Sequence, residues 1–186
     1  MPAMLPVAVS RGQTASLRTV GGMVGRAGLD DVVDLLRGVR GLVPVTGAGV
    51  AGGFAARGWE PGGRLRDGFE SSWDKGGVRG WVHPYDGGVR VELTVWLRDV
   101  DEDTGYFGDL EAVYRDGEAV LAGVVAGLVA SPLAVDLVAA GGRDRDADDF
   151  VACRRWALGE RALLAGVVQE DTDLPVRVVV VWEEER

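Results

Sequence analysis

Three residue types that often carry enzyme chemistry occur only once each. The chain of 186 residues holds one cysteine, Cys153, one histidine, His83, and one lysine, Lys75. A single cysteine excludes an intramolecular disulfide and fits a reducing compartment, so we expect a cytoplasmic protein. The single lysine lies outside any G-x-x-x-x-G-K-[ST] run, which excludes a phosphate-binding loop of that type.

The scarcity of histidine and cysteine also limits metal and nucleophile chemistry. A zinc site needs three or four protein ligands, and neither His83 nor Cys153 lies in a spacing that suggests one. A serine–histidine–acid triad would have to use His83, and the G-x-S-x-G nucleophile motif is absent. We therefore expect no metal, no cofactor and no catalytic residue.

Basic residues are few relative to acidic ones. Lysine and arginine number 20 against 29 aspartates and glutamates, which gives a net charge of -9. This balance argues against a nucleic-acid partner, because phosphate binding needs basic patches, and it is compatible with a basic protein partner. No apolar run approaches the ~20 residues of a membrane span, and Met1–Val9 lacks the charged start of a signal peptide.

The clearest structural signal is the alternation from Val89 to Arg98. Odd-numbered positions are aliphatic and even-numbered positions are polar or tryptophan, which is typical of a strand with one buried face. The segment Val78–Tyr85 precedes it, and Asp86-Gly87 between them is suited to a two-residue type I′ turn. The pattern therefore predicts a β-hairpin.

The two-residue turn fixes the register of this hairpin. It places Val82 opposite Val91 and Val78 opposite Val95 on one aliphatic face, which we expect to pack against helices. On the other face Trp81 lies opposite Glu92 and His83 opposite Arg90. A slip of one residue would mix the two faces, which a buried face does not permit.

The second, mixed face of the hairpin is the candidate partner-binding surface. Its members are Trp81, His83, Tyr85, Arg90, Glu92 and Trp96. Aromatic and arginine side chains are typical of binding hot spots. Large aromatic side chains are usually well buried, so core or second-layer packing of the two tryptophans is the alternative.

The rest of the chain divides into helical and strand-like segments. Apolar residues at helical spacing predict helices at 29–40, 48–57, 106–129 and 132–140, the last beginning at Ser131-Pro132. Strands are predicted at 42–45, 69–73, 151–158, 161–170 and 175–183. The run Val176–Trp182 is almost entirely apolar, as a strand covered on both faces would be.

This order of elements predicts the fold class. Strands grouped in hairpins, with helices segregated from them, indicate an α+β protein with a mainly antiparallel sheet of about six strands: three strands, a long helix, and three more strands. We expect the helices on one face of the sheet. Residues 1–28 are expected to form a poorly ordered arm and residues 29–186 a single domain.

Two motifs deserve an alternative interpretation. Residues 47–52 match the dinucleotide-binding pattern G-x-G-x-x-G, but 29 glycines make a chance match expected, and hairpins follow instead of a βαβ unit. The alternating aspartates of Asp99–Asp103 and Asp144–Asp149 suggest calcium loops. Both lack the glycine and glutamate that an EF-hand requires, so we interpret them as solvated acidic loops.

Two stretches carry a resemblance to a protein family. The run WALGERALLAGVVQEDTDLPV, residues 156–176, resembles the C-terminal hairpin of small uncharacterised actinobacterial proteins, and Ala56-Arg57-Gly58-Trp59-Glu60 resembles their early helix followed by Gly-Trp. Some of these families are similar in size and element order to immunity proteins that neutralise polymorphic toxins. The resemblance implies an immunity role and carries no functional residues with it.

Three hypotheses for function follow. The first is a non-catalytic protein-binding domain, of which an immunity protein for a basic toxin is the specific form, since an acidic protein captures a basic partner rapidly. The second is an enzyme with a carboxylate site at Asp99–Asp103 or Asp144–Asp149, which requires a concave pocket lined by these acids. The third is a structural or chaperone-like homodimer with a large apolar interface.

Overall fold

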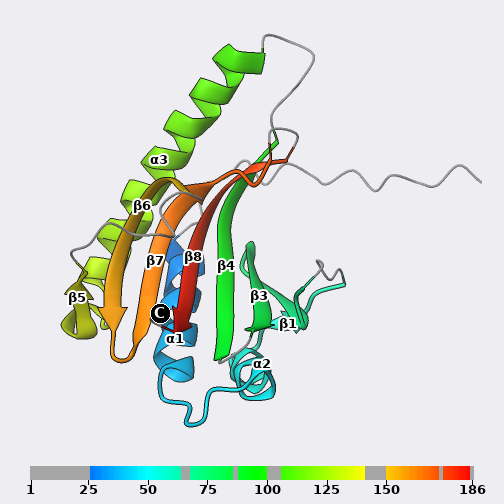
Figure 1. Ribbon diagram of the computed structural model, residues 1–186, viewed down its shortest axis with the longest axis vertical. Coiled ribbons are helices and arrows are strands. Elements are labelled where there is room, and N and C mark those ends of the chain that lie inside the picture. Colours follow the sequence, from blue (N-terminus) through cyan, green and yellow to red (C-terminus); the bar gives the residue numbers. More distant parts are fainter. Residues whose placement is uncertain are drawn as a thin grey trace, which may run out of the picture.

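The computed structural model describes residues 26–63, 68–85, 88–99, 106–140, 150–171 and 174–184. In this part of the chain three α-helices and one 3-10 helix accompany a single eight-stranded antiparallel sheet (Figure 1). The helices are α1 (Arg26–Val39), α2 (Gly47–Ala56), α3 (Tyr106–Ala130) and the 3-10 helix η1 (Ala134–Asp136). The strands are β1 (Glu60–Pro61), β2 (Ser71–Lys75), β3 (Val78–Tyr85), β4 (Gly88–Arg98), β5 (Leu137–Ala139), β6 (Phe150–Leu158), β7 (Arg161–Val168) and β8 (Val176–Glu184).

The sheet has the strand order β1-β2-β3-β4-β8-β7-β6-β5, and every neighbouring pair is antiparallel. The predicted α+β class and antiparallel sheet are thus confirmed. The prediction of about six strands differs by β1 and β5, edge strands of two and three residues. Segments this short show no alternation in sequence, because a period of two needs at least four or five residues to be recognised.

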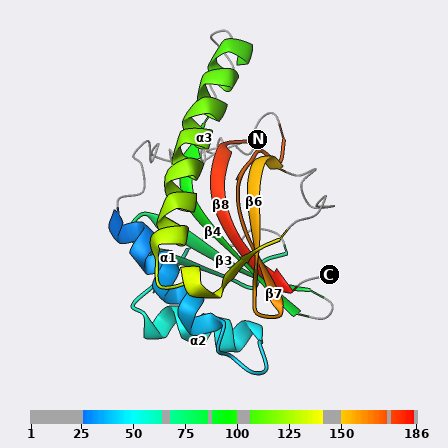
Figure 2. The ribbon, with the colours of Figure 1, turned by 90° about the vertical axis from the view of Figure 1, so that its left-hand side faces the viewer.

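The three α-helices lie on one side of the sheet. Figure 1 views the sheet from its helix-free side, with α1 behind the strands, and Figure 2 shows α1 and α3 together on one side of them. Contacts of α1 with β4, and of α3 with β4, β7 and β8, join the two layers. The N-terminal turns of α3 extend beyond the ends of the strands in both views.

The hairpin register agrees with the expectation. Val82 pairs with Val91, Trp81 with Glu92, and His83 with Arg90. Four aliphatic residues of β4, Val89, Val91, Leu93 and Val95, are buried in the core beneath the helices, as predicted. Leu97 pairs with Arg177 and is half-buried outside that core, so the expectation is wrong there. The turn residues Asp86-Gly87 lie outside the described part of the chain.

The centre of the sheet is covered on both faces. Strand β8 lies between β4 and β7, and every residue from Val176 to Trp182 is buried, so the strand predicted from its apolar run is confirmed. Its even-numbered residues join the core beneath the helices, whereas Val179 and Val181 join a second, smaller cluster on the opposite face. Arg177 lies on that second face and is also buried, being 8% exposed.

Two local predictions are wrong. Residues 132–140 form η1 and the edge strand β5, not a helix, because Ser131 caps only a tight turn, in which its Oγ accepts from the Leu133 N–H at 3.1 Å. Residues 42–45 form no strand, since no neighbouring strand pairs with them among the described residues. A search of the described helices finds none with the length and apolarity to cross a bilayer.

Candidate functional site

The helix-free face of the sheet carries most of the predicted partner-binding residues. Trp81 and His83 on β3, with Arg90 and Glu92 on β4, point to this face as cross-strand neighbours. Trp81 is only 5% exposed and packs on Phe69, with ring centroids 5.4 Å apart. Tyr85, at the end of β3, is half-buried. The structure therefore brings the polar members together and leaves Trp81 with little surface to offer a partner.

Trp96 does not lie on this face, so that part of the prediction is wrong. The register of β4 against β8 shifts between Thr94 and Trp96, which makes Val95 an extra residue on β4. Two residues then oppose one, and the alternation of faces is interrupted. Trp96 consequently points into the core beneath α3, where a Cβ at Gly117 would lie 3.5 Å from its ring.

A chain of charged groups crosses the helix-free face and centres on Arg177. Its Nη1 donates to Glu92 Oε1 at 2.5 Å and to Thr94 Oγ1 at 3.4 Å, and its Nη2 donates to Glu170 Oε1 at 2.6 Å. Arg90 completes the chain at longer range, 3.9 Å from Glu92 and 3.5 Å from Glu183. Because a buried charge needs a partner, these contacts explain how Glu92 and Arg177 are accommodated inside the sheet surface.

These groups line a polar pocket of about 490 Å³. Its walls are Phe69, His83, Arg90, Glu92, Phe150, Val168, Gln169, Glu170, Arg177 and Val179. His83 lies against Phe69 with ring centroids 5.1 Å apart. The two carboxylates that face the pocket, Glu92 and Glu170, both accept from Arg177, and Arg90 lies 3.9 Å from Glu92, so each carboxylate has a cationic partner within the protein.

Sequence reasoning missed the two residues that organise this pocket, Arg177 and Glu170. A signal for Arg177 was present, since it is the single charged residue in the apolar run Val176–Trp182. A charge in a strand covered on both faces requires a nearby counter-charge. That counter-charge is Glu92. It lies 85 residues away in the sequence, and it comes close to Arg177 because β4 pairs with β8.

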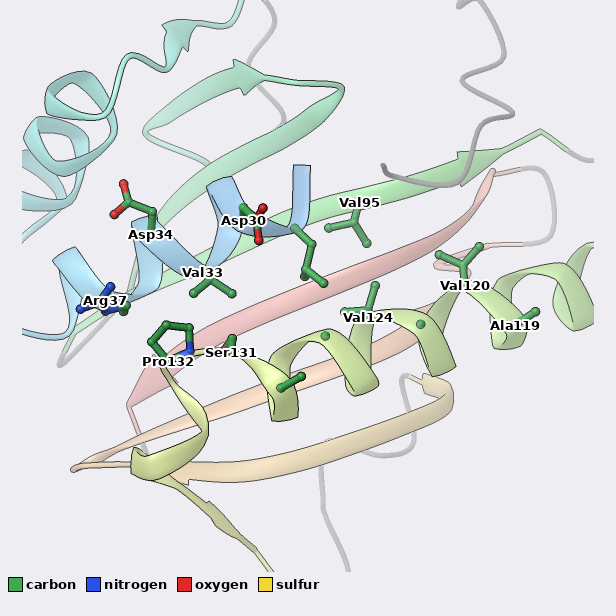
Figure 3. Close-up of a pocket in the computed structure, with 14 residues that line it drawn as sticks. Asp30, Val33, Asp34, Arg37, Val95, Ala119, Val120, Val124, Ser131 and Pro132 are labelled. Atoms are coloured by element: carbon green, nitrogen blue, oxygen red, sulfur yellow. The ribbon is translucent and has the colours of Figure 1, made fainter. Parts of the chain in front are cut away.

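A second hollow lies in the helical layer, between α1 and α3, and has a volume of about 660 Å³ (Figure 3). We call it the interhelical groove. It is lined by Leu29, Asp30, Val33, Asp34, Arg37, Val95, Ala119, Val120, Gly123, Val124, Gly127, Ala130, Ser131 and Pro132. In Figure 3, Val33 points from α1 toward α3, Val120 and Val124 stand on α3, and Val95 lies on β4 beyond the end of α1. These four valines form the apolar floor of the groove.

The wall that α1 contributes to the groove is charged. Asp30 and Asp34 are exposed on it, and Asp34 pairs with Arg57 Nε at 3.2 Å. Asp30 has no ion pair among the described residues, and Arg37 is the single cation among those that line the groove. The groove is therefore apolar at its floor, and its rim carries Asp30 and Arg37 as exposed charges of opposite sign beside the paired Asp34.

The sequence motifs set aside earlier add little to either hollow. The G-x-G-x-x-G match lies inside α2, whose N-cap Thr46 accepts from the Gly49 N–H at 3.1 Å, and no strand precedes it in the described residues. Of the acidic loops, Asp99 is described and exposed, and the remaining aspartates lie outside the described residues. Among the residues that are described, no group of three histidine, cysteine or acidic side chains is arranged to hold a metal.

Comparison of the chain with protein-family models, with curated proteins and with solved structures finds no match.

Proposed function

We propose that the chain is a non-catalytic protein-binding domain whose partner is a basic protein, and that it acts as an immunity protein by covering a basic toxin. The cytoplasm, where a single cysteine stays reduced, is the compartment we propose for this capture.

The observation that supports this proposal most is the charge of the helical layer. Helix α3 carries four acidic side chains and one arginine, and the end that extends beyond the sheet includes Asp109 and Glu111, both exposed. Exposed charge of one sign raises the rate at which an oppositely charged protein is captured. The overall charge of -9 acts in the same direction.

The polar pocket favours binding over catalysis for a separate reason. A general acid or base must be able to reach a substrate proton within hydrogen-bond distance. Glu92 is 5% exposed, and Arg177 donates to both Glu92 and the more exposed Glu170. We interpret this network as one that stabilises the sheet around a buried arginine.

The proposal is tested by titrating the purified chain with the basic product of a neighbouring gene in a calorimeter. We expect a one-to-one complex whose affinity falls as salt is raised, because screening weakens interactions between exposed charges. Co-expression should also restore growth to cells that produce that product as a toxin. The absence of binding at low salt, or continued toxicity despite a formed complex, would contradict the immunity role.

A further inference from the structure

We propose that the interhelical groove is the docking site for a basic, amphipathic α-helix of the partner protein. This inference rests on the proposed function for the identity of the partner, and it adds where the partner binds and which structural element it presents.

The dimensions of the groove suit a short helix. On α3 the open part of the groove runs from Ala119 to Gly127, where α1 packs against α3. This is a rise of about 12 Å, or roughly two turns of helix. A helix that docks in a groove buries residues at positions i, i+3, i+4 and i+7, which extend over two to three turns. The floor valines are buried, so the apolar surface that a docked face can reach comes mainly from the half-buried Leu29 and from the exposed small residues Ala119, Gly123 and Ala130.

Glycine on α3 keeps the groove open. A Cβ placed on Gly123 would meet no heavy atom within 4 Å, whereas one on Gly127 would clash with Leu29 of α1, at 2.0 Å. Thus α1 and α3 pack directly at Gly127, and the hollow opens from there past Gly123 to Ala119. These exposed small residues leave room for another helix to approach at close range.

Charge complementarity selects a basic occupant. Asp34 and Asp116 are already paired, with Arg57 and Arg98. Asp30 stands on the α1 wall, and α3 continues from the groove into the segment that bears the exposed Glu118 and Glu111. Lysine or arginine side chains flanking the apolar face of a docked helix would face these carboxylates. A second copy of this chain would instead bring its own acidic helices against them, which like-charge repulsion disfavours.

The probe for this inference is a fluorescent leucine/lysine peptide of about 14 residues, about 21 Å long as a helix, with all leucines on one face. A peptide of the same pattern with glutamate in place of lysine is the charge control. A scrambled leucine/lysine peptide, which has no apolar face, is the shape control. We expect fluorescence anisotropy to show binding of the first peptide to the full chain, and much weaker binding of both controls.

A variant whose new side chain fills the interhelical groove tests whether the peptide binds there. Gly123→Leu adds a side chain to the open space and should weaken binding by about ten-fold or more, as the loss of a central contact does. Gly52→Leu is the matched control, because Gly52 is also an exposed helical glycine with nothing within 4 Å of its Cβ position, and it lies on α2 away from the groove. We expect Gly52→Leu to bind as the unaltered chain does.

Charge variants at the rim test the preference for a basic helix. Asp30→Lys should weaken binding and Arg37→Glu should strengthen it, each by about two- to five-fold, the range expected for one exposed pair. Glu160→Lys, in the exposed turn between β6 and β7, makes the same reversal far from the groove and should have a smaller effect.

The results distinguish this inference from the proposed function. If the basic partner binds and Gly123→Leu binds it equally well, the groove is not the site and the proposed function stands. Loss of binding in His83→Ala or Arg90→Ala alone would move the site to the polar pocket. A concentration-dependent dimer abolished by Gly123→Leu would identify a second copy as the occupant and overturn the inference. If neither the basic partner nor the peptide binds, the proposed function fails as well.

Discussion

Gly80 of β3 lies beneath the ring of Phe54, and this contact shows how a single residue sets the distance between α2 and the sheet. A Cβ at Gly80 would lie 2.5 Å from Phe54 Cε1 and 3.2 Å from Leu93 Cδ2. We expect Gly80→Ala to lower the free energy of unfolding by about 1–3 kcal/mol, because the ring must move out of a packed position. Urea denaturation measures this change.

The control for that prediction is Gly52→Ala in α2. Its new methyl group enters open space, and alanine is a better helix former than glycine, so we expect it to raise the free energy of unfolding by about 0.5–1 kcal/mol. If Gly80→Ala were as stable as the unaltered chain, the close packing of Phe54 on β3 would be wrong.

Arg177 provides a second prediction at the residue scale. Arg177→Met leaves Glu92, a carboxylate that is 5% exposed, without its closest counter-charge. We expect a loss of about 3–5 kcal/mol in the free energy of unfolding, the cost of an uncompensated buried charge. The double variant Arg177→Met with Glu92→Met removes both charges and should be more stable than Arg177→Met alone. A double variant less stable than either single one would show that the pair is not the source of the loss.

Among the elements, the β-hairpin could be predicted from the sequence, whereas the irregularity at Val95 in its second strand, β4, could not. The alternation from Val89 to Val95 and the Asp86-Gly87 pair are local signals, and they indicated the register that the structure confirms. The extra residue at Val95 has no local signal, because an aliphatic residue fits either a regular strand or a bulge. This irregularity is the reason that Trp96 was assigned to the wrong face.

The segment after α3 was mistaken for a similar reason. Ser131-Pro132 is a good helix start by residue type, yet β6 offers an edge with which Leu137–Ala139 pairs. Pairing with a strand that follows in the chain is a tertiary effect and overrides a short helical pattern.

Two glycines of helix α3 have different surroundings, and this difference leads to a prediction about the stability of the helix on the sheet. Gly117 is buried, and a Cβ there would lie 3.2 Å from Val167 Cγ1, whereas Gly123 faces open space. Gly117→Leu should therefore lower the urea midpoint, because overpacking costs about 1–3 kcal/mol against a gain of about 1 kcal/mol in helix propensity. Gly123→Leu should leave the midpoint unchanged or raise it. Equal effects at the two positions would contradict the packing of α3 on β7.

At the scale of the whole molecule, the antiparallel sheet and the one-sided helical layer followed from the order of elements. Neither hollow could be predicted in that way. The interhelical groove joins α1 to α3, which begin 80 residues apart in the chain, and it exists because both helices pack on the same face of the sheet, where each contacts β4. The polar pocket likewise depends on β4 and β8 being neighbours.

The acidic side chains on the two faces of the molecule differ in whether an arginine is paired with them. On the helix-free face, Glu92 and Glu170 are both paired with Arg177. On the helical face, Asp30, Asp109, Glu111 and Glu118 are exposed. Exposed charge of one sign attracts an oppositely charged partner from a distance, and for this reason we propose that a basic protein binds on the helical face.

Valine methyl NMR is the most direct test of that assignment. The leucine/lysine peptide is added to methyl-labelled protein, and the spectra are followed through the titration. The account predicts shifts at Val33, Val95, Val120 and Val124, which line the interhelical groove, with Val168 and Val179 of the polar pocket unchanged. Shifts confined to Val168 and Val179, or no shifts at saturating peptide, would contradict it.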